Sequence, residues 1–287
     1  MRFVLKTCTG LTKVRHRNEV GQTLSSLSLS AKRVLFLALS QIDTKELLSE
    51  EVIEVSAEFY SKATGLDRYA AYSALKEGAK VLSSTALVLN KDDLILLSEE
   101  LGLPYSSKSK KIPDKIDLNL TEFCAYYDSM GVVKIKFTNT AKRYFSKLIG
   151  SERRYTTQVL KSVVNLSSVN SANLYQFIRK HVSMNSKKRS IDVSVNELKD
   201  EMGLYEVKED GKYYKYPKYS FFIRDVINRS MKEINEKTEI KDLSFVVVGK
   251  KGRMVDVIRF SFTVKGSEAG FSDEDVKFFR DFDDNCF

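Results

Sequence analysis

The chain contains 287 residues, enough for two domains that each bury a core, and 47 Lys and Arg against 38 Asp and Glu give it a formal net charge of +9. Hydrophobic residues make up 43% and charged residues 30%, a balance that argues against a largely disordered chain. No apolar run approaches the ~18 residues of a membrane-spanning helix, and the N-terminus lacks a signal-peptide core, so we expect a cytoplasmic protein with no membrane partner.

The charge is unevenly distributed along the chain. Residues 266–287 hold seven acidic and two basic side chains, so this acidic C-terminal tail carries −5 and residues 1–265 carry +14. Such a basic body favours a polyanionic partner, either nucleic acid or, less well, an anionic membrane surface. Three scattered cysteines, Cys8, Cys124 and Cys286, indicate neither a disulfide framework nor a zinc site, and we expect no metal and no cofactor.

Residues 1–17 are interpreted as an N-terminal arm, and a leucine-rich leading helix is expected within residues 18–43. Six leucines in this segment could indicate a leucine-zipper coiled coil: Leu24, Leu27, Leu29, Leu35, Leu37 and Leu39. Their spacing does not keep a heptad. A core helix is therefore the favoured interpretation, and a dimer surface is the alternative.

An internal repeat organises the chain. The segment IEVSAEFYSKATGL (53–66) aligns without gaps on IDVSVNELKDEMGL (191–204), with five identical positions. In both copies a short alternating strand leads into a serine that can cap a helix, and the helix ends at Gly-Leu, a left-handed C-cap. A second helix is expected after each copy, at 67–84 and, after a loop, within 213–235.

A β-hairpin is expected after the second of these helices in each half. In the later half, strands at 243–248 and 255–264 flank a turn at 249–253. In the earlier half, residues 85–90 must pair with residues 132–137. Strand, helix, helix and hairpin is the order of a winged helix, whose second helix enters the DNA major groove.

The predicted fold class is therefore α+β, with two tandem winged-helix domains. The first domain spans 18–150, contains an insertion at 91–131 and closes with a helix at 139–150. The second spans 151–265 and has its leading helix at 169–182, after a junction at 151–158.

The helix expected within 213–235 has two different faces. An apolar stripe at spacings of three and four predicts a core face: Phe222, Ile223, Val226, Ile227, Ser230 and Ile234. The other face and its lead-in carry the candidate DNA-binding residues: Lys215, Lys218, Tyr219, Ser220, Phe221, Arg224 and Asn228. Arginine can hold guanine through two hydrogen bonds, asparagine can hold adenine, and an aromatic ring suits a thymine methyl. The alternative is a solvated helix with a tyrosine-rich loop packed on the domain.

Cations elsewhere support DNA binding. The hairpin turn carries Lys250, Lys251 and Arg253, where no core needs them, and we expect them to contact phosphate. A second basic group precedes the repeated strand: Lys187, Lys188 and Arg189. In the first domain the equivalent helix offers Arg68, Lys76 and Lys80, which are expected to make backbone contacts, with plain surface charge as the alternative.

Enzymatic signatures are mostly missing, so we expect a binding protein with no catalytic residues. There is no G-x-x-x-x-G-K-[ST] phosphate loop. The two histidines, His16 and His181, lie far apart in sequence and are expected at the surface or at helix ends.

Several segments of the second half match a known family: YTTQVLKSVVNLSSVNSANLYQFIRKH, VNELKDEMGL, YPKYSFFIRDVINRSMKEINEKTEI and VVVGKKGRMVDVIRFSF. The chain resembles the iteron-binding replication initiators of theta-replicating bacterial plasmids, such as those of plasmid F. The resemblance extends from about residue 18 to 263. It implies two tandem winged helices and DNA-recognition positions at Lys218, Phe222 and Arg224, of which we assign Phe222 to the core. Ile223 and Asp225 depart from the additional arginines of the family.

The resemblance also implies a role and partners. Monomers would bind double-stranded iterons in the origin with both domains, promote origin opening and recruit host replication proteins such as helicase and the host initiator. Homodimers joined through the first domain, in equilibrium with monomers, would bind an operator inverted repeat and repress the protein's own gene, which bears on plasmid copy control. The setting would be the bacterial cytoplasm.

The tail RDFDDNCF resembles the acidic, phenylalanine-ended C-terminus of bacterial single-stranded-DNA-binding proteins. The hypothesis is that Asp281, Asp283, Asp284 and Phe287 bind a host replication factor that grips such tails. The alternative is an acidic end that aids solubility. For the whole chain, the competing functions are a winged-helix transcription regulator without origin function and a nicking initiator of rolling-circle type.

Overall fold

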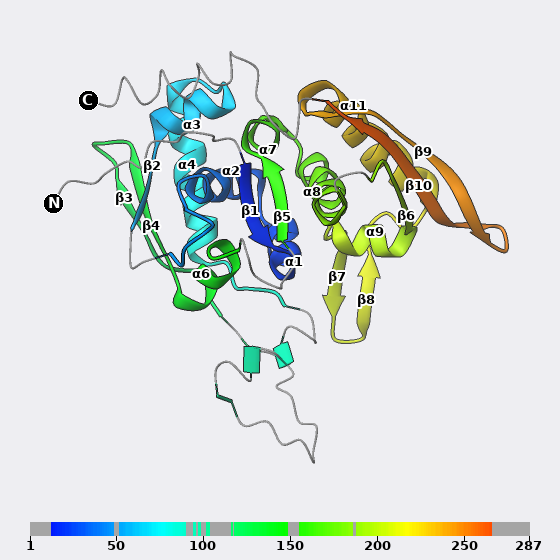
Figure 1. Cartoon of the computed structure of the whole chain (residues 1–287), viewed down its shortest axis with the longest axis horizontal. Helices are drawn as coiled ribbons and strands as arrows, with labels where there is room; N and C mark the ends of the chain where they lie inside the picture. Colours follow the sequence, from blue (N-terminus) through cyan, green and yellow to red (C-terminus); the bar gives the residue numbers. More distant parts are fainter. Residues whose placement is uncertain are drawn as a thin grey trace.

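The computed structural model describes residues 13–48, 52–89, 118–148, 155–185 and 188–265, together with positions 94, 95, 97, 98, 102, 103 and 116. Figure 1 shows two α+β halves side by side, with strands β1 (Lys13–Arg17) and β5 (Tyr155–Val159) between them. Among these described residues, no helix combines the length and apolar content needed to cross a bilayer.

The first half is a winged helix. Its elements are η1 (Asn18–Val20), α1 (Gly21–Ser26), α2 (Leu29–Leu39), β2 (Ile53–Ser56), α3 (Ala57–Thr64), α4 (Arg68–Ser83), β3 (Thr121–Tyr127), β4 (Val132–Phe137) and α6 (Asn139–Phe145). Strand β4 is central, and β2 and β3 pair with it antiparallel on either side. Helices α3 and α4 form the helix-turn-helix, and β3 and β4 form the wing.

The second half repeats this arrangement. Its elements are α7 (Leu160–Asn165), α8 (Val169–Met184), β6 (Ser190–Ser194), α9 (Val195–Glu201), β7 (Tyr205–Lys208), β8 (Gly211–Tyr214), α10 (Tyr219–Phe222), η2 (Ile223–Ile227), α11 (Asn228–Lys237), β9 (Ile240–Lys251) and β10 (Met254–Val264). Strand β10 is central between β6 and β9, as β4 is between β2 and β3. The prediction of two tandem winged helices is confirmed.

The repeated segments owe their common structure to their caps. Ser56 Oγ accepts a hydrogen bond from the Phe59 amide at 3.0 Å, and Ser194 Oγ accepts one from the Glu197 amide at 3.1 Å. These bonds satisfy N–H groups that the first turn of a helix leaves free. Gly65 and Gly203 follow the helices with φ of 71° and 66°, the left-handed conformation that glycine adopts at low cost.

The predicted partner strand in the first wing is wrong. Strand β3, which lies inside the predicted insertion 91–131, pairs with β4 and sets Tyr126 opposite Val133. Within the described part of the predicted strand, residues 85–89, Ala86 forms an isolated bridge with Asn119. The predicted insertion is therefore too long at its C-terminal end, because residues 121–131 belong to the wing.

The predicted arm 1–17 and junction 151–158 also need correction. Strand β1 takes the last five residues of the arm and pairs antiparallel with β5 across its whole length. His16 lies in this sheet and is only 1% exposed, so its predicted surface position is wrong. His181 lies in the last turn of α8, as predicted.

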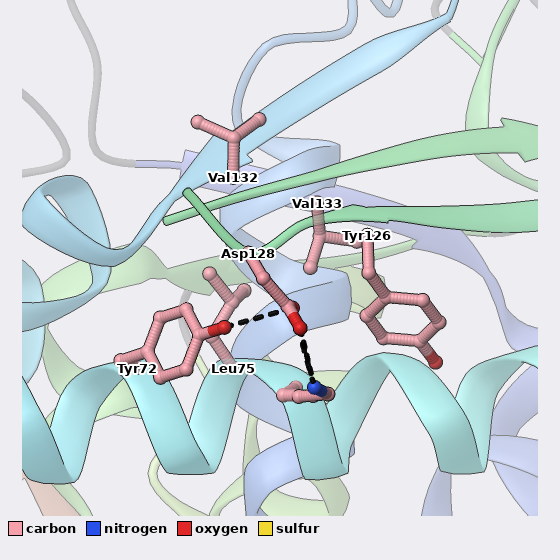
Figure 2. Close-up of a pocket in the computed structure, with 7 residues that line it drawn as sticks. Tyr72, Leu75, Tyr126, Asp128, Val132 and Val133 are labelled. Carbon is pink, nitrogen blue, oxygen red and sulfur yellow. Dashed lines mark hydrogen bonds and ion pairs between the residues drawn. The ribbon is translucent and has the colours of Figure 1, made fainter. Parts of the chain in front are cut away.

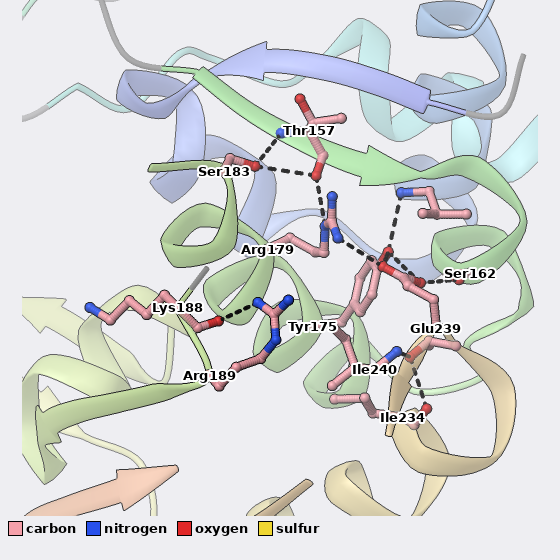
Figure 3. Close-up of polar contacts among 12 residues, drawn as sticks. Thr157, Ser162, Tyr175, Arg179, Ser183, Lys188, Arg189, Ile234, Glu239 and Ile240 are labelled. Atoms are coloured by element: carbon pink, nitrogen blue, oxygen red, sulfur yellow. Dashed lines mark hydrogen bonds and ion pairs between the residues drawn. The ribbon is translucent and has the colours of Figure 1, made fainter. Parts of the chain in front are cut away.

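A mostly buried polar network joins this central sheet to the second winged helix (Figure 3). The Glu239 carboxylate, between α11 and β9, accepts hydrogen bonds from Ser162 Oγ at 2.6 Å and Tyr175 Oη at 2.8 Å, and Arg179 Nη1 lies 3.2 Å away. Arg179 Nε also donates to the Thr157 carbonyl oxygen of β5 at 2.8 Å. The network therefore ties α7, α8 and β5 to the end of the α10–α11 helix.

The leucine-rich segment forms core helices, as favoured from its spacing. Leu24, Leu27, Leu35, Leu37 and Leu39 are buried in the hydrophobic core. Arg33 of α2 donates to the carbonyl oxygens of Val164 and Leu166 at 2.9 Å each, which attaches the same helix to the second half. These leucines are buried within the single chain.

Candidate nucleic-acid interface

The helix predicted to read DNA is continuous from α10 to α11 but contains the π-helical turn η2. In a regular α-helix, residues four apart are rotated by about 40°, so a stripe with that spacing turns steadily away from the core. A π-turn, with its i→i+5 hydrogen bonds, removes part of that rotation. It lets four residues spaced by four stay buried together: Phe222, Val226, Ser230 and Ile234.

The opposite side of this helix is exposed. Ser220, Arg224 and Asn228 follow the same spacing of four, and all three are exposed, as is Phe221 beside them. The π-turn that aligns the buried stripe therefore also aligns these side chains along the helix. The prediction of one core face and one exposed polar face is confirmed, and Phe222 lies in the core as assigned.

Arg224 is held by its neighbours within the helix. Its Nε and Nη2 donate to Asp225 Oδ1 and Oδ2 at 2.8 Å each, and its Cζ lies 4.9 Å from the centroid of the Phe221 ring. The side-chain hydrogen bond from Arg224 lowers the pKa of the Asp225 carboxyl. The guanidinium is therefore presented to solvent with a restricted orientation.

The tyrosine-rich lead-in packs largely on the protein, which the sequence interpretation did not favour. Lys199 of α9 donates to the Tyr216 carbonyl oxygen at 2.8 Å, and its Nζ lies 5.1 Å from the Phe222 ring centroid. Tyr216 and Tyr219 are half-buried against the core. The candidate Tyr219 therefore has mainly a packing role, whereas Lys215 and Lys218 are exposed.

The loop expected before this helix contains a hairpin that the sequence analysis missed. Strands β7 and β8 pair in register, with Tyr205 opposite Tyr214, and Figure 1 shows the hairpin projecting from the second half. Lys212 Nζ lies between the Asp200 carboxylate, at 2.5 Å, and the Tyr205 ring, at 4.2 Å. The alternating Tyr, Val and Lys residues on either side of Glu209 and Asp210, with Gly211 next, are the signal that could have revealed it.

The second wing carries its cations at the tip. Strands β9 and β10 extend further than predicted and meet at a turn in which Gly252 has φ of 62°. Lys250, Lys251 and Arg253 are all exposed there. In the described part of the chain, none of the three forms an ion pair or a side-chain hydrogen bond, so their charges are available to a ligand.

The predicted basic group before β6 does not join this tip. Ser190, at the start of β6, pairs with Ser261 of β10, about eight residues from the turn, or roughly 27 Å at 3.4 Å per residue. Lys188 is half-buried, with Nζ 3.5 Å from His181 Nδ1, and Arg189 is exposed. Figure 3 draws both beside the buried network. Lys187 lies outside the described residues.

The equivalent helix of the first half, α4, is tied to its own wing. Lys76 Nζ lies 3.1 Å from Asp128 Oδ2, and the Tyr72 hydroxyl donates to Asp128 Oδ1 at 2.8 Å. Figure 2 shows these side chains around a small hollow that Tyr126 also lines. The hydrogen bond to Asp128 raises the pKa of Lys76. Lys76 is therefore engaged within the protein, whereas Arg68 and Lys80 are exposed.

The comparisons with known proteins place the chain in a family. Residues 13–179 match the family model "Initiator Replication protein, WH1", and residues 210–262 match "Initiator Rep protein, WH2". The chain belongs to the initiator replication proteins. The predicted family is thereby confirmed.

One curated relative of this initiator is the PI protein of Escherichia coli. The two are 42% identical over 270 residues, which cover 93% of this chain and 88% of the relative. A crystal structure of the Pi initiator protein in complex with iteron DNA superposes with a TM-score of 0.80 at 41% identity, covering 89% of this chain and 98% of that one. The arrangement of both winged helices is therefore shared with a DNA-bound relative.

Some exposed residues of the initiator's helix faces were missed from the sequence. Arg229 is 77% exposed in its side chain and Lys232 is also exposed, both on α11, and Tyr69 is 84% exposed in the first turn of α4. The charge and four-residue spacing of Lys232 after Asn228 could have revealed it. The tail candidates Asp281, Asp283, Asp284 and Phe287 lie outside the described residues.

Proposed function

We propose that this initiator binds double-stranded origin DNA at iteron repeats. The exposed side of α10–α11 reads base edges, and the cations at the tip of the second wing contact phosphate. The Pi initiator, 41% identical over most of the chain, is a relative solved with iteron DNA. In the first half, Arg68, Lys80 and, once released from Asp128, Lys76 supply accessory contacts to the DNA backbone.

One observation carries this proposal. Ser220, Arg224 and Asn228 form an exposed row on a helix whose opposite row, Phe222, Val226, Ser230 and Ile234, is buried. Burial of one row holds the helix rigidly while the other row remains free to contact a groove. Arginine and asparagine are the side chains best suited to guanine and adenine. A solvated helix with no ligand would not need an exposed aromatic ring next to a guanidinium of fixed orientation.

The wider function follows from the family. Bound monomers promote opening of the adjacent duplex and recruit host replication proteins, including helicase, the host initiator and, through the acidic tail, factors that bind single-stranded-DNA-binding-protein tails. Dimers in equilibrium with monomers bind an operator inverted repeat and repress the initiator's own gene. These steps are binding events in the bacterial cytoplasm and break no covalent bond.

Footprinting on origin DNA tests the proposal. A duplex with several direct repeats should show protection at each repeat. Both winged-helix domains should contact the same face of the DNA duplex. A random duplex of equal length at the same salt concentration is the control, because non-specific affinity depends strongly on salt. Equal protection of both duplexes would contradict iteron recognition.

Two competing functions predict different results. A transcription regulator without origin function would bind its operator but fail to support replication of an origin plasmid when supplied in trans. A nicking initiator would convert supercoiled origin DNA with Mg²⁺ into a form with protein attached covalently. We expect replication in the first assay and no adduct in the second.

A further inference from the structure

One edge of the Arg224 guanidinium, the side-on edge formed by Nε and Nη2, already binds Asp225 within the protein. Nε and Nη2 donate in parallel to the two oxygens of Asp225, both at 2.8 Å. This is the two-bond geometry in which a guanidinium matches a carboxylate. The Phe221 ring, 4.9 Å from Cζ, adds a second restraint. Two neighbours on the same helix therefore fix the direction in which Arg224 points.

The contact leaves a defined part of Arg224 for a ligand. A guanidinium has five N–H donors, and Asp225 uses two of them. Within the described residues the other three have no protein partner. They include one N–H on each Nη nitrogen along the end-on edge, a parallel pair that matches O6 and N7 of guanine.

Asp225 is less exposed than the two arginines that contact it, Arg224 and Arg229. Its side chain is 24% exposed, against 67% for Arg224 and 77% for Arg229, whose Nη2 lies 3.7 Å from the same carboxylate. One carboxylate thus lies between two arginines at the surface that faces the proposed DNA. Exposed ion pairs contribute little to folding stability, so a stability role does not explain this arrangement.

The Asp225 carboxylate affects the affinity for specific and for non-specific DNA differently. Phosphates supply most of the affinity for random DNA, and a nearby negative charge repels them. A tethered Arg224 also cannot swing freely toward a phosphate. On the correct site, by contrast, the tether lowers the conformational entropy that Arg224 loses when it binds a base.

We propose that Asp225 is a specificity-determining residue, which positions Arg224 for end-on recognition of guanine and disfavours phosphate contacts on other DNA. The inference rests on the proposed function, since it requires that the α10–α11 helix lies against base edges. Asp225 itself need not touch the DNA and acts through Arg224.

The test uses the full chain and the variant Asp225→Asn. Dissociation constants are measured on an iteron duplex and on a random duplex of equal length at one salt concentration. We expect tighter binding to the random duplex, weaker binding to the iteron and a fall of roughly tenfold in the specificity ratio, the size expected when one two-bond base contact loses its geometry.

Asp242→Asn is the matched control. It removes the same charge from the same domain, and its φ of 55° is one that asparagine tolerates. We expect it to change both affinities by the same factor and to leave the ratio unchanged. Thermal unfolding of both variants should match that of the wild type.

The outcomes separate this inference from the proposed function. A wild-type protein that does not distinguish the two duplexes contradicts the proposed function. A wild type that does distinguish them, with an unchanged ratio in Asp225→Asn, overturns the role of Asp225 alone. In an Arg224→Ala background, Asp225→Asn should no longer weaken binding to the iteron duplex; if it still does, Asp225 does not position Arg224.

Discussion

The imidazole Nε2 of His16 and the amide Nε2 of Gln158 lie 2.9 Å apart, although 142 residues separate them in the chain. His16 Nδ1 also lies 2.9 Å from its neighbour's carbonyl oxygen, that of Arg17. A neutral ring satisfies both contacts, because Nδ1–H donates to the carbonyl and Nε2 accepts from the amide. This pair sits in the β1–β5 sheet between the two winged helices.

Acid should destabilise the fold through this histidine. Burial, helped by the charges of Lys32 and Lys180, lowers the pKa of His16 from the 6.5 of an ordinary histidine to about 4. Its contribution to the free energy of unfolding is therefore complete above pH 6.5 and is lost as the pH falls toward 4. A shift of this size corresponds to about 3 kcal/mol.

Urea unfolding between pH 7.5 and 4.5 checks this expectation. The variant His16→Gln should lose stability less steeply with falling pH, whatever its stability at pH 7.5. His181, whose pKa burial also lowers to about 4, contributes in the same direction, so His181→Gln serves as the comparison. An identical pH dependence in wild type and His16→Gln would contradict the prediction.

Replacing Arg224 by alanine should reduce specific binding. We expect a loss of roughly 1–3 kcal/mol on the iteron duplex and little change on random DNA, because a base contact is lost. Titration of each duplex with the protein at one salt concentration gives the two dissociation constants that check this loss. An equal loss on both would show that Arg224 contacts only phosphate.

Replacing Lys251 by alanine should instead weaken binding to every sequence. One phosphate contact fewer lowers the slope of log K against log salt by about one unit. Lys188→Ala is the control, because Lys188 lies beside His181, remote from the wing tip along the strand. A slope that falls in Lys188→Ala and not in Lys251→Ala would reverse the assignment of the interface.

Replacing Glu239 by alanine should destabilise the fold. Arg179 would lose the carboxylate 3.2 Å from its Nη1 while its side chain stays only 10% exposed, and the Ser162 and Tyr175 hydroxyls would lose their acceptor. Removing one partner of such a pair costs about 3 kcal/mol or more. Denaturant unfolding measures the loss.

The double variant Glu239→Leu with Arg179→Met is the control for this prediction. It removes both charges, so it should recover part of the stability that Glu239→Ala loses. The single variants Glu239→Leu and Arg179→Met are measured beside it. A double variant whose loss equals the sum of those two losses would show that the two side chains do not interact.

Local sequence determined much of this protein. The capping serines Ser56 and Ser194, the left-handed Gly65 and Gly203 and the alternation of β10 act over a few residues, so the repeat and the second wing could be predicted. The two faces of the α10–α11 helix could be predicted for the same reason, because Phe222 and Arg224 differ in polarity and helical spacing separates them.

Only the tertiary structure decided the choices between distant partners. Residues 85–90 and 121–127 both favour a strand, and packing against β4 selects the second. His16 is buried because β1 finds β5 far along the chain, and the tyrosine-rich lead-in packs on Lys199 of another helix. Arg224 and Asp225 are adjacent in sequence, yet their contact depends on the rotamers that the two side chains adopt in the folded helix. Local propensities act over a few residues, whereas these contacts gain their free energy from burial and pairing that exist only once the whole chain has folded.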